Sequence, residues 1–237
     1  MRVLALDTTT RGGSVALVEN DRVMAEHGGD VTRSHAERLP LDLLRLLDAA
    51  GVPLSAIDVF ACASGPGSFT GLRIGIATIQ GLAFVTRRRV AAISALEALA
   101  HGVSRELGAG SLVAAWIDAH RREVFSALYR VVDAPLFSAA RLVEIDPPSV
   151  ARPGETLERW RAQFGVPSVV AGDAAVAYAA ETPATARIVG PPLLGGPIGL
   201  LAVERARRGD TVDPAGVQPL YVRRPDAEMA REREARG

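Results

Sequence analysis

Lysine is absent from this chain, and its absence excludes several kinds of site. All 27 basic residues are arginine, so the chain lacks the lysine of a Walker-type phosphate loop, of a protein-kinase strand or of a Schiff base. The 27 acidic residues balance the arginines, which removes the broad positive field that drives independent, salt-sensitive binding of nucleic acid. Any RNA is therefore expected to be shared with a partner.

Cysteine and long apolar runs are also scarce. The single cysteine, Cys62, lies in the apolar run 59–63, so we expect a small buried side chain rather than a nucleophile, and no disulfide framework. No uncharged apolar stretch reaches the roughly 18 residues needed to span a bilayer, and Met1 leads into an expected strand without a signal-like segment. These features predict a cytoplasmic protein.

The apolar pattern predicts an α/β chain. With 237 residues and 48% hydrophobic content, the chain is long enough to bury a sizeable core in one large domain or two small ones. Expected strands cover residues 3–6, 14–18, 22–26, 57–63, 90–93, 113–117, 123–131 and 168–171. Expected helices cover residues 39–50, 70–86, 94–107, 155–164 and 197–208. The proline and glycine segments 147–148, 152–154 and 190–192 are expected to form turns.

A unit of strand, aspartate, polar turn and strand occurs twice. Ala5-Leu6-Asp7 is matched 111 residues later by Trp116-Ile117-Asp118, and each aspartate is followed nine and ten positions later by Ala-Leu. A match this short also arises by chance, but as a duplication it predicts two lobes with a cleft between them. We expect an N-terminal lobe over 1–108, a C-terminal lobe over 109–225 and a polar tail over 226–237.

The stretch SGPGSFTGLRIG stands where a strand passes into a helix. No lysine follows Gly71, which excludes a P-loop, and the spacing of Gly65, Gly67 and Gly71 does not match a dinucleotide fingerprint. Two interpretations remain. The backbone N–H groups at the start of the helix can bind an anion, or the glycines only form a turn in which Ser68 or Thr70 caps the helix.

Two helices carry more apolar surface than one sheet face requires. Six of the nine positions over 39–47 are leucine, behind a capping box at 34–37, and Pro40 is expected to kink or restart this helix. In the helix over 70–86 the apolar residues extend around most of the circumference, and interior glycines predict the close approach of another backbone. We interpret both helices as an interface with another protein, the alternative being cover by the second lobe. The expected interface residues are Leu39, Leu43, Leu46, Leu47, Gly71, Leu72, Gly75, Thr78, Ile79 and Leu82.

Four segments, LALDTTT, SHAERL, GPGSFTGLRIG and IDAHRREVF, resemble the TsaB (YeaZ) family of bacteria. The similarity is dense over 1–130, and later only 171–173 and 219–223 look familiar. It implies an actin-like ATPase fold of two ribonuclease-H-like lobes, with mixed sheets flanked by helices. It also implies a non-catalytic partner of TsaD, which transfers a threonylcarbamoyl group to an adenosine of certain tRNAs, while TsaE is the ATPase and TsaC makes the adenylate. Family members pair through the two apolar helices, with TsaD or with themselves as a homodimer.

A rival interpretation is an ATP-dependent small-molecule kinase of the same fold class. In it Asp7 holds magnesium through water and Asp118 faces it across the cleft as a base, although an aspartate at a strand end more often caps a turn. Three threonines also stand where such kinases have Gly-Gly-Thr. We expect no cofactor of the chain's own, with ATP or ADP at a subunit junction. The candidate residues for nucleotide or anion binding are Asp7, Thr8, Thr9, Thr10, Gly65, Gly67, Ser68 and Asp118.

Histidine spacing argues against a metal site and against a peptidase. None of the four histidines has a partner four residues away, so the His-x-x-x-His pair of the catalytic subunit is missing, and neither His-Glu-x-x-His nor Gly-x-Ser-x-Gly occurs. The roles of His35 and His120 stay open, as does any direct contact with tRNA. The arginines over 87–89 and 121–122 are either solvated or part of a surface for RNA or an acidic partner.

Overall fold

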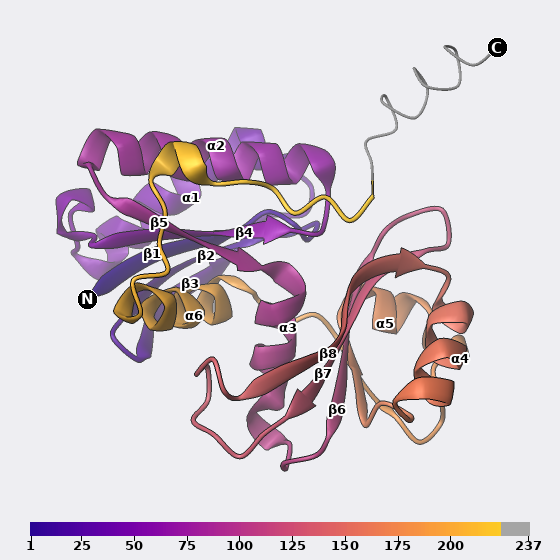
Figure 1. Cartoon of the computed structure of the whole chain (residues 1–237). Coiled ribbons are helices and arrows are strands. Elements are labelled where there is room, and N and C mark those ends of the chain that lie inside the picture. The colour runs from indigo at the N-terminus through magenta and orange to yellow at the C-terminus, as the bar shows by residue number, and fades with distance from the viewer. Residues whose placement is uncertain (224–237) are drawn as a thin grey trace.

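The chain folds into two lobes that share one strand topology (Figure 1). The computed structural model describes residues 1–223. The strands of the first sheet lie in the order β3-β2-β1-β4-β5, and those of the second in the equivalent order β8-β7-β6-β9-β10. In each sheet the first three strands are antiparallel, and the last two run parallel to the first. This equivalence confirms the duplication that the repeated aspartate unit predicts.

The elements have the following bounds. The strands are β1 (Arg2–Asp7), β2 (Ser14–Glu19), β3 (Arg22–Gly28), β4 (Val59–Gly65), β5 (Arg89–Ser94), β6 (Leu112–Asp118), β7 (Val124–Val131), β8 (Leu142–Ala151), β9 (Val169–Ala171) and β10 (Arg187–Val189). The helices are α1 (His35–Ala50), α2 (Phe69–Thr86), α3 (Ala95–Val103), α4 (Pro153–Gln163), α5 (Asp173–Ala177) and α6 (Gly195–Arg207). Short 3-10 turns cover Leu54–Ala56, Ser104–Glu106, Ala179–Glu181 and Pro214–Gly216.

Three hydrophobic layers hold the lobes together. One outer layer packs α1 and α2 on the first sheet around Leu4 and Phe60, and the other packs α4 and α5 on the second sheet around Trp116 and Trp160. The central layer lies between the two sheets, where α3 and α6 pack against each other (Figure 1). Small and β-branched residues such as Ala5 face this layer, because alternate strand residues point to opposite faces of a sheet.

The connecting helices exchange lobes. Helix α6 follows the second sheet in the sequence but packs across the strands of the first, and α3 follows the first sheet but packs against β6 of the second. Beyond α6 the chain returns to the first lobe, where Val212 pairs with Val90 and the backbone carbonyl of Pro214 accepts a hydrogen bond from Gln80, before Arg223 reaches the second lobe at Ala119. Cutting the chain after residue 108 therefore does not separate two self-contained bodies. The expected tail over 226–237 lies outside the described residues.

The expectation of turns at 147–148 and 152–154 is wrong. Pro147 and Pro148 lie inside β8, which is an edge strand of the second sheet. On the open side of an edge strand no neighbouring strand needs a backbone N–H group, so proline is tolerated there. The pairing register with β7 also shifts at this point. Pro153 begins α4, the helical position where its fixed φ angle is favourable. The prediction also omitted the short elements α5 and β10.

Helix α1 runs unbroken through Pro40, so the expected restart does not occur. Its capping box is present, because the Glu37 carboxylate accepts hydrogen bonds from the Ser34 backbone N–H at 2.8 Å and the Ser34 hydroxyl at 2.6 Å. Pro40 and Ala36 are both exposed, so water can reach the carbonyl group that the proline leaves without its helical donor.

Helix α2 is long and apolar enough to cross a membrane by length and composition alone. Here it covers β4, and the buried side chains of Leu72 and Ile79 belong to the packed face of the helix. One side of the helix therefore packs on the first sheet, and the other side is exposed.

Candidate functional site

The glycine-rich stretch packs on the turn that follows β1. A Cβ atom added at Gly67 would lie 2.5 Å from Thr9 Cβ, and one added at Gly75 would lie 3.1 Å from Leu6 Cδ1. The backbone N–H of Ser68 donates to the carbonyl of Thr9 at 3.3 Å. The interior glycines thus permit the close backbone approach that the sequence predicts, but toward this chain's own turn.

Asp7 caps that turn from the end of β1. Its Oδ1 accepts hydrogen bonds from the backbone N–H of Thr9 at 2.8 Å and from the Thr9 hydroxyl at 2.5 Å, while Oδ2 accepts from the Thr10 hydroxyl at 2.6 Å. The Asp7 side chain is almost fully buried. Both carboxylate oxygens therefore hold the turn in place.

The structure brings most of the predicted anion-site residues together at the start of α2. Ser68 is the N-cap, and its hydroxyl accepts from the Gly71 backbone N–H at 3.3 Å. Thr8 lies beneath the helix with its hydroxyl buried and without a hydrogen-bond partner among the described residues. Gly65 adopts a φ of +118°, which suits glycine, where β4 turns toward the helix. The seven candidates of the first lobe, Asp7, Thr8, Thr9, Thr10, Gly65, Gly67 and Ser68, form this one packed unit.

A C-terminal segment lies over the same unit. The backbone N–H of Leu220 donates to the carbonyl of Ser64 at 2.7 Å. The Tyr221 ring packs on Phe69 with 5.4 Å between centroids, and Arg73 lies 3.9 Å above the centre of the Phe69 ring. Helix α2 therefore begins beneath chain that comes from the far end of the sequence.

The sequence analysis missed a buried polar network beside this turn. The Arg38 guanidinium pairs with Asp42 at 2.6 Å, contacts His35 Nδ1 at 2.8 Å and donates to the carbonyl of Gly12. A side chain at Gly29 would collide with it. Burial, and then the Arg38 charge, lower the pKa of His35. The available signal was an oppositely charged pair four residues apart on a helix that is otherwise rich in leucine.

Asp118 is the second-lobe counterpart of Asp7, at the end of β6. Its backbone N–H donates to Asp173 Oδ1 at 3.0 Å, and its carboxylate accepts from the His120 backbone N–H at 3.0 Å and lies 3.3 Å from His120 Nδ1. Burial raises the pKa of Asp173 despite this hydrogen bond. The contacts described for Asp118 lie within its own lobe, so it is not part of the unit around Asp7.

No metal centre forms among residues 1–223, because no three His, Cys, Asp or Glu side chains gather there in a way that could hold a metal ion.

Most of the expected interface residues are enclosed by the chain itself, which corrects that prediction. The reason is that α1 and α2 both turn this side toward the first sheet, where each residue packs on strands or on the turn after β1. Thr78 and Leu82 are only half-buried. The enclosed residues are Leu39, Leu43, Leu46, Leu47, Gly71, Leu72, Gly75 and Ile79.

The opposite side of the two helices is exposed and carries several large apolar side chains among charged ones such as Arg45 and Asp48. The exposed fraction is 59% for Leu44, 77% for Phe84 and 79% for Val85. We call this surface the outer face, and it consists of Leu41, Leu44, Ala77, Gly81, Phe84 and Val85. Large apolar side chains gathered on neighbouring helices are typical of a protein-binding surface.

The sequence of this chain is similar to those of known proteins. The family model for TsaD, tRNA N6-adenosine threonylcarbamoyltransferase, matches residues 16–169. The tRNA threonylcarbamoyladenosine biosynthesis protein TsaB of Escherichia coli is 41% identical over 55% of this chain and 55% of its own length. The Bacillus subtilis TsaB is 32% identical over 55% and 56%. The matched part thus spans about half the length of these curated relatives, whereas an uncharacterised protein of Mycobacterium tuberculosis is 31% identical over 95% of this chain and 93% of its own.

Solved structures extend the similarity to nearly the whole chain. YeaZ from Pseudomonas aeruginosa superposes with a TM-score of 0.74 at 34% identity, covering 93% of this chain and 99% of its own. The ADPNP-bound activator of the 2-hydroxyisocaproyl-CoA dehydratase from Clostridium difficile, at a TM-score of 0.51 and 12% identity over 88% and 97%, shares the fold alone. The expected actin-like ATPase fold is confirmed. From the match to YeaZ over almost its full length, together with the curated TsaB relatives, this chain belongs to the TsaB (YeaZ) family.

Proposed function

We propose that this chain is a non-catalytic scaffold or activator subunit in the synthesis of N6-threonylcarbamoyladenosine on tRNA. It acts in the cytoplasm by pairing with the TsaD transferase subunit, and is linked functionally to TsaE and TsaC. The names of the curated relatives and of the matching family model support the pathway. The observation that carries the pairing role is the apolar outer face of α1 and α2.

The outer face has the composition of a helix-docking surface. Ala77 and Gly81 are exposed and lie one turn apart on α2, and no described atom lies within 4 Å of the position that a Cβ at Gly81 would occupy. A partner helix can therefore approach the backbone of α2 closely and cover Val85, one turn beyond Gly81. Full burial of a Val, Leu or Phe side chain contributes about 1.5–3 kcal/mol, so a few such residues stabilise a complex substantially before the entropic cost of association.

The turn after β1 supports the absence of catalysis by this chain alone. Both oxygens of Asp7 are engaged by Thr9 and Thr10, and Gly67 packs directly on that turn. We propose that a nucleotide, ATP or ADP, binds at a junction with the partner. In this chain, Ser68 and the backbone N–H groups at the start of α2 are the groups that would bind its phosphates.

The test is purification of the chain with TsaD from the same organism. Val85→Asp and Leu44→Asp place a charge on the outer face, and each is expected to abolish the complex on gel filtration with light scattering while leaving the melting temperature of the lone chain within about 2 °C. The matched control is Val143→Asp, an exposed valine on β8 of the other lobe, which should leave the complex intact.

Formation of tRNA threonylcarbamoyladenosine by the reconstituted system should fall with the loss of the complex. Phosphorylation of a metabolite by the lone chain, or an unchanged complex in both outer-face variants, would refute the scaffold role. A variant that loses self-association but still binds TsaD would show that the outer face serves a homodimer instead.

A further inference from the structure

The turn between β6 and β7 has an unusual backbone for its sequence. His120, Arg121 and Arg122 are three successive residues with φ angles of 57°, 55° and 63°. Residues other than glycine visit this left-handed region singly, and hairpin turns that need it favour Asn-Gly or Gly-Gly. Here Arg121 and Arg122, with long cationic side chains, occupy positions where glycine or asparagine is usually found. Strained backbone of this kind persists only where surrounding contacts impose it.

Such contacts are present on both sides of the turn. The Ala119 backbone N–H donates to the Glu123 carbonyl at 3.1 Å, and the Glu123 N–H donates to the His120 carbonyl at 3.0 Å. Asp118 holds the His120 backbone from the strand end. From the C-terminal segment, Arg223 donates to the Ala119 carbonyl at 2.7 Å and also pairs with Glu123. Contacts within the chain therefore hold the turn in this conformation.

The fixed turn presents positive charge. Arg121 and Arg122 are exposed, and Arg152 is exposed beside them, since it follows the β8 residue Ala151 that pairs with Val124. Of the carboxylates next to the arginines, Glu123 pairs with Arg223, and Asp118 accepts a hydrogen bond from the His120 backbone N–H. The turn projects at the end of the second lobe that lies toward the C-terminal segment (Figure 1).

We propose that this arginine turn, residues 119–123, contacts the phosphate backbone of tRNA when the chain is in its complex. The proposal rests on the proposed function, which supplies the tRNA. A planar guanidinium binds a phosphate through two parallel hydrogen bonds, and a fixed backbone removes the cost of ordering the turn itself. Because the chain has no net charge, the turn adds affinity to RNA that the partner already holds rather than capturing RNA alone.

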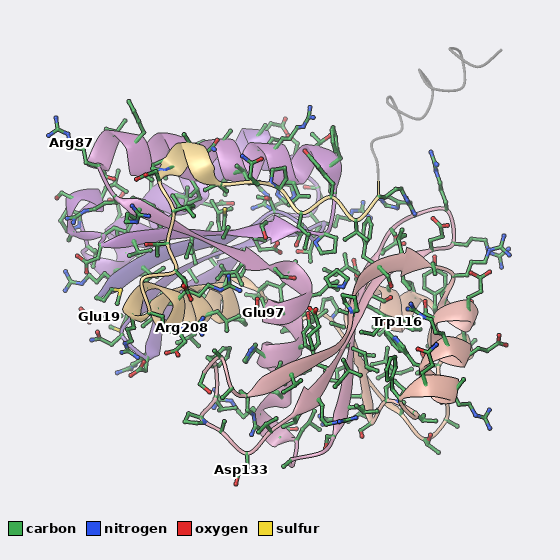
Figure 2. All side chains as sticks on the ribbon, viewed as in Figure 1. Glu19, Arg87, Glu97, Trp116, Asp133 and Arg208 are labelled. Atoms are coloured by element: carbon green, nitrogen blue, oxygen red, sulfur yellow. The ribbon has the colours of Figure 1, made fainter. Side chains whose placement is uncertain are left out.

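The experiment compares one substitution at two matched positions. Arg122→Gly removes one charge and relieves one left-handed residue in the turn. Arg87→Gly does the same at the αL cap of α2, where Arg87 is exposed at the far end of the first lobe (Figure 2). Both variants should melt at a higher temperature than the natural chain, because glycine adopts positive φ angles without strain.

Only the turn variant is expected to change RNA binding. In the complex with TsaD, Arg122→Gly should weaken binding of a tRNA transcript about threefold to tenfold at low salt, and should reduce the slope of log affinity against log salt by about one. Arg87→Gly should leave both quantities unchanged. The variant Arg122→Gln keeps the backbone preferences of an ordinary residue, and should lose a similar affinity with an unchanged melting temperature.

Each other outcome is decisive. A more stable Arg122→Gly complex with unchanged tRNA affinity and salt slope would mean that the turn is only structural. Failure of the turn variants to bind TsaD would mean that it contacts protein, which also overturns the proposal. If the natural chain itself does not bind TsaD before RNA is added, the proposed function fails and this proposal falls with it, whereas an intact complex with unchanged RNA binding removes the arginine turn alone.

Discussion

Two glycines on α2 should respond in opposite ways to the same substitution. At Gly75 an added Cβ would lie 3.1 Å from Leu6 Cδ1 and 3.2 Å from Thr8 Cβ, closer still to the Thr8 hydroxyl, and both neighbours are fully buried. Overpacking of this kind costs about 1–3 kcal/mol, and the better helix propensity of alanine offsets about 1 kcal/mol of it. At Gly81 the space is open among the described residues, so only the gain of about 0.5–1 kcal/mol remains.

If overpacking costs about 2–3 kcal/mol at this tight site, Gly75→Ala should destabilise the lone chain by about 1–2 kcal/mol after the helix-propensity offset, while Gly81→Ala stabilises it. At about 2–4 °C per kcal/mol for a chain of this size, the two variants should differ in melting temperature by about 3–12 °C. Thermal unfolding followed by circular dichroism measures the difference. The interpretation of Gly75 as a partner contact predicts the reverse, namely an unchanged melting temperature and a lost complex. That result would refute the packing of α2 on the turn after β1.

Three further expectations concern buried groups. Asp42→Ala leaves Arg38 buried without its partner and should cost about 3–5 kcal/mol in urea unfolding, whereas breaking the exposed pair of Arg187 should cost under about 1 kcal/mol. Burial lowers the pKa of His101 from 6.5 to about 4, so the unfolded chain binds more protons between these values, and stability should fall as the pH drops from 6.5 to 4. His101→Phe should remove that part of the pH dependence of unfolding, and an identical profile would contradict the assignment. Burial raises the pKa of the Cys62 thiol to about 12, so a maleimide should label it only as denaturant unfolds the chain, and labelling of the native protein would exclude its burial.

Local patterns were enough to predict most of the strands and the duplication. The apolar runs that end in Asp7 and Asp118 became equivalent strands, β1 and β6, because a run bounded by polar turn residues has few alternatives. The edge strand β8 was missed, since Pro147 and Pro148 are compatible with a turn and with an edge, and only the sheet order distinguishes the two.

Which side of a helix faces the core was not predictable from composition. In α2 apolar residues lie on both sides, so Ile79 and Val85 are indistinguishable in the sequence, although one is fully buried and the other largely exposed. The same limit applied to the site. The turn contacts of Asp7 were anticipated as an alternative, but the position of Arg38 depends on the backbone of Gly29, just after β3, and on the carbonyl of Gly12, which only the folded chain brings together.

The exchange of α3 and α6 between the lobes also constrains how the protein is made. The inner face of the first sheet, with Val3, Ala5 and Val18, is covered by a helix that begins at Gly195. A ribosome must therefore complete most of the polypeptide before the earliest strands gain their cover, and during that interval the nascent N-terminal half presents an apolar sheet surface. Synthesis and maturation of the two halves are thus coupled from the first strand to the last helix.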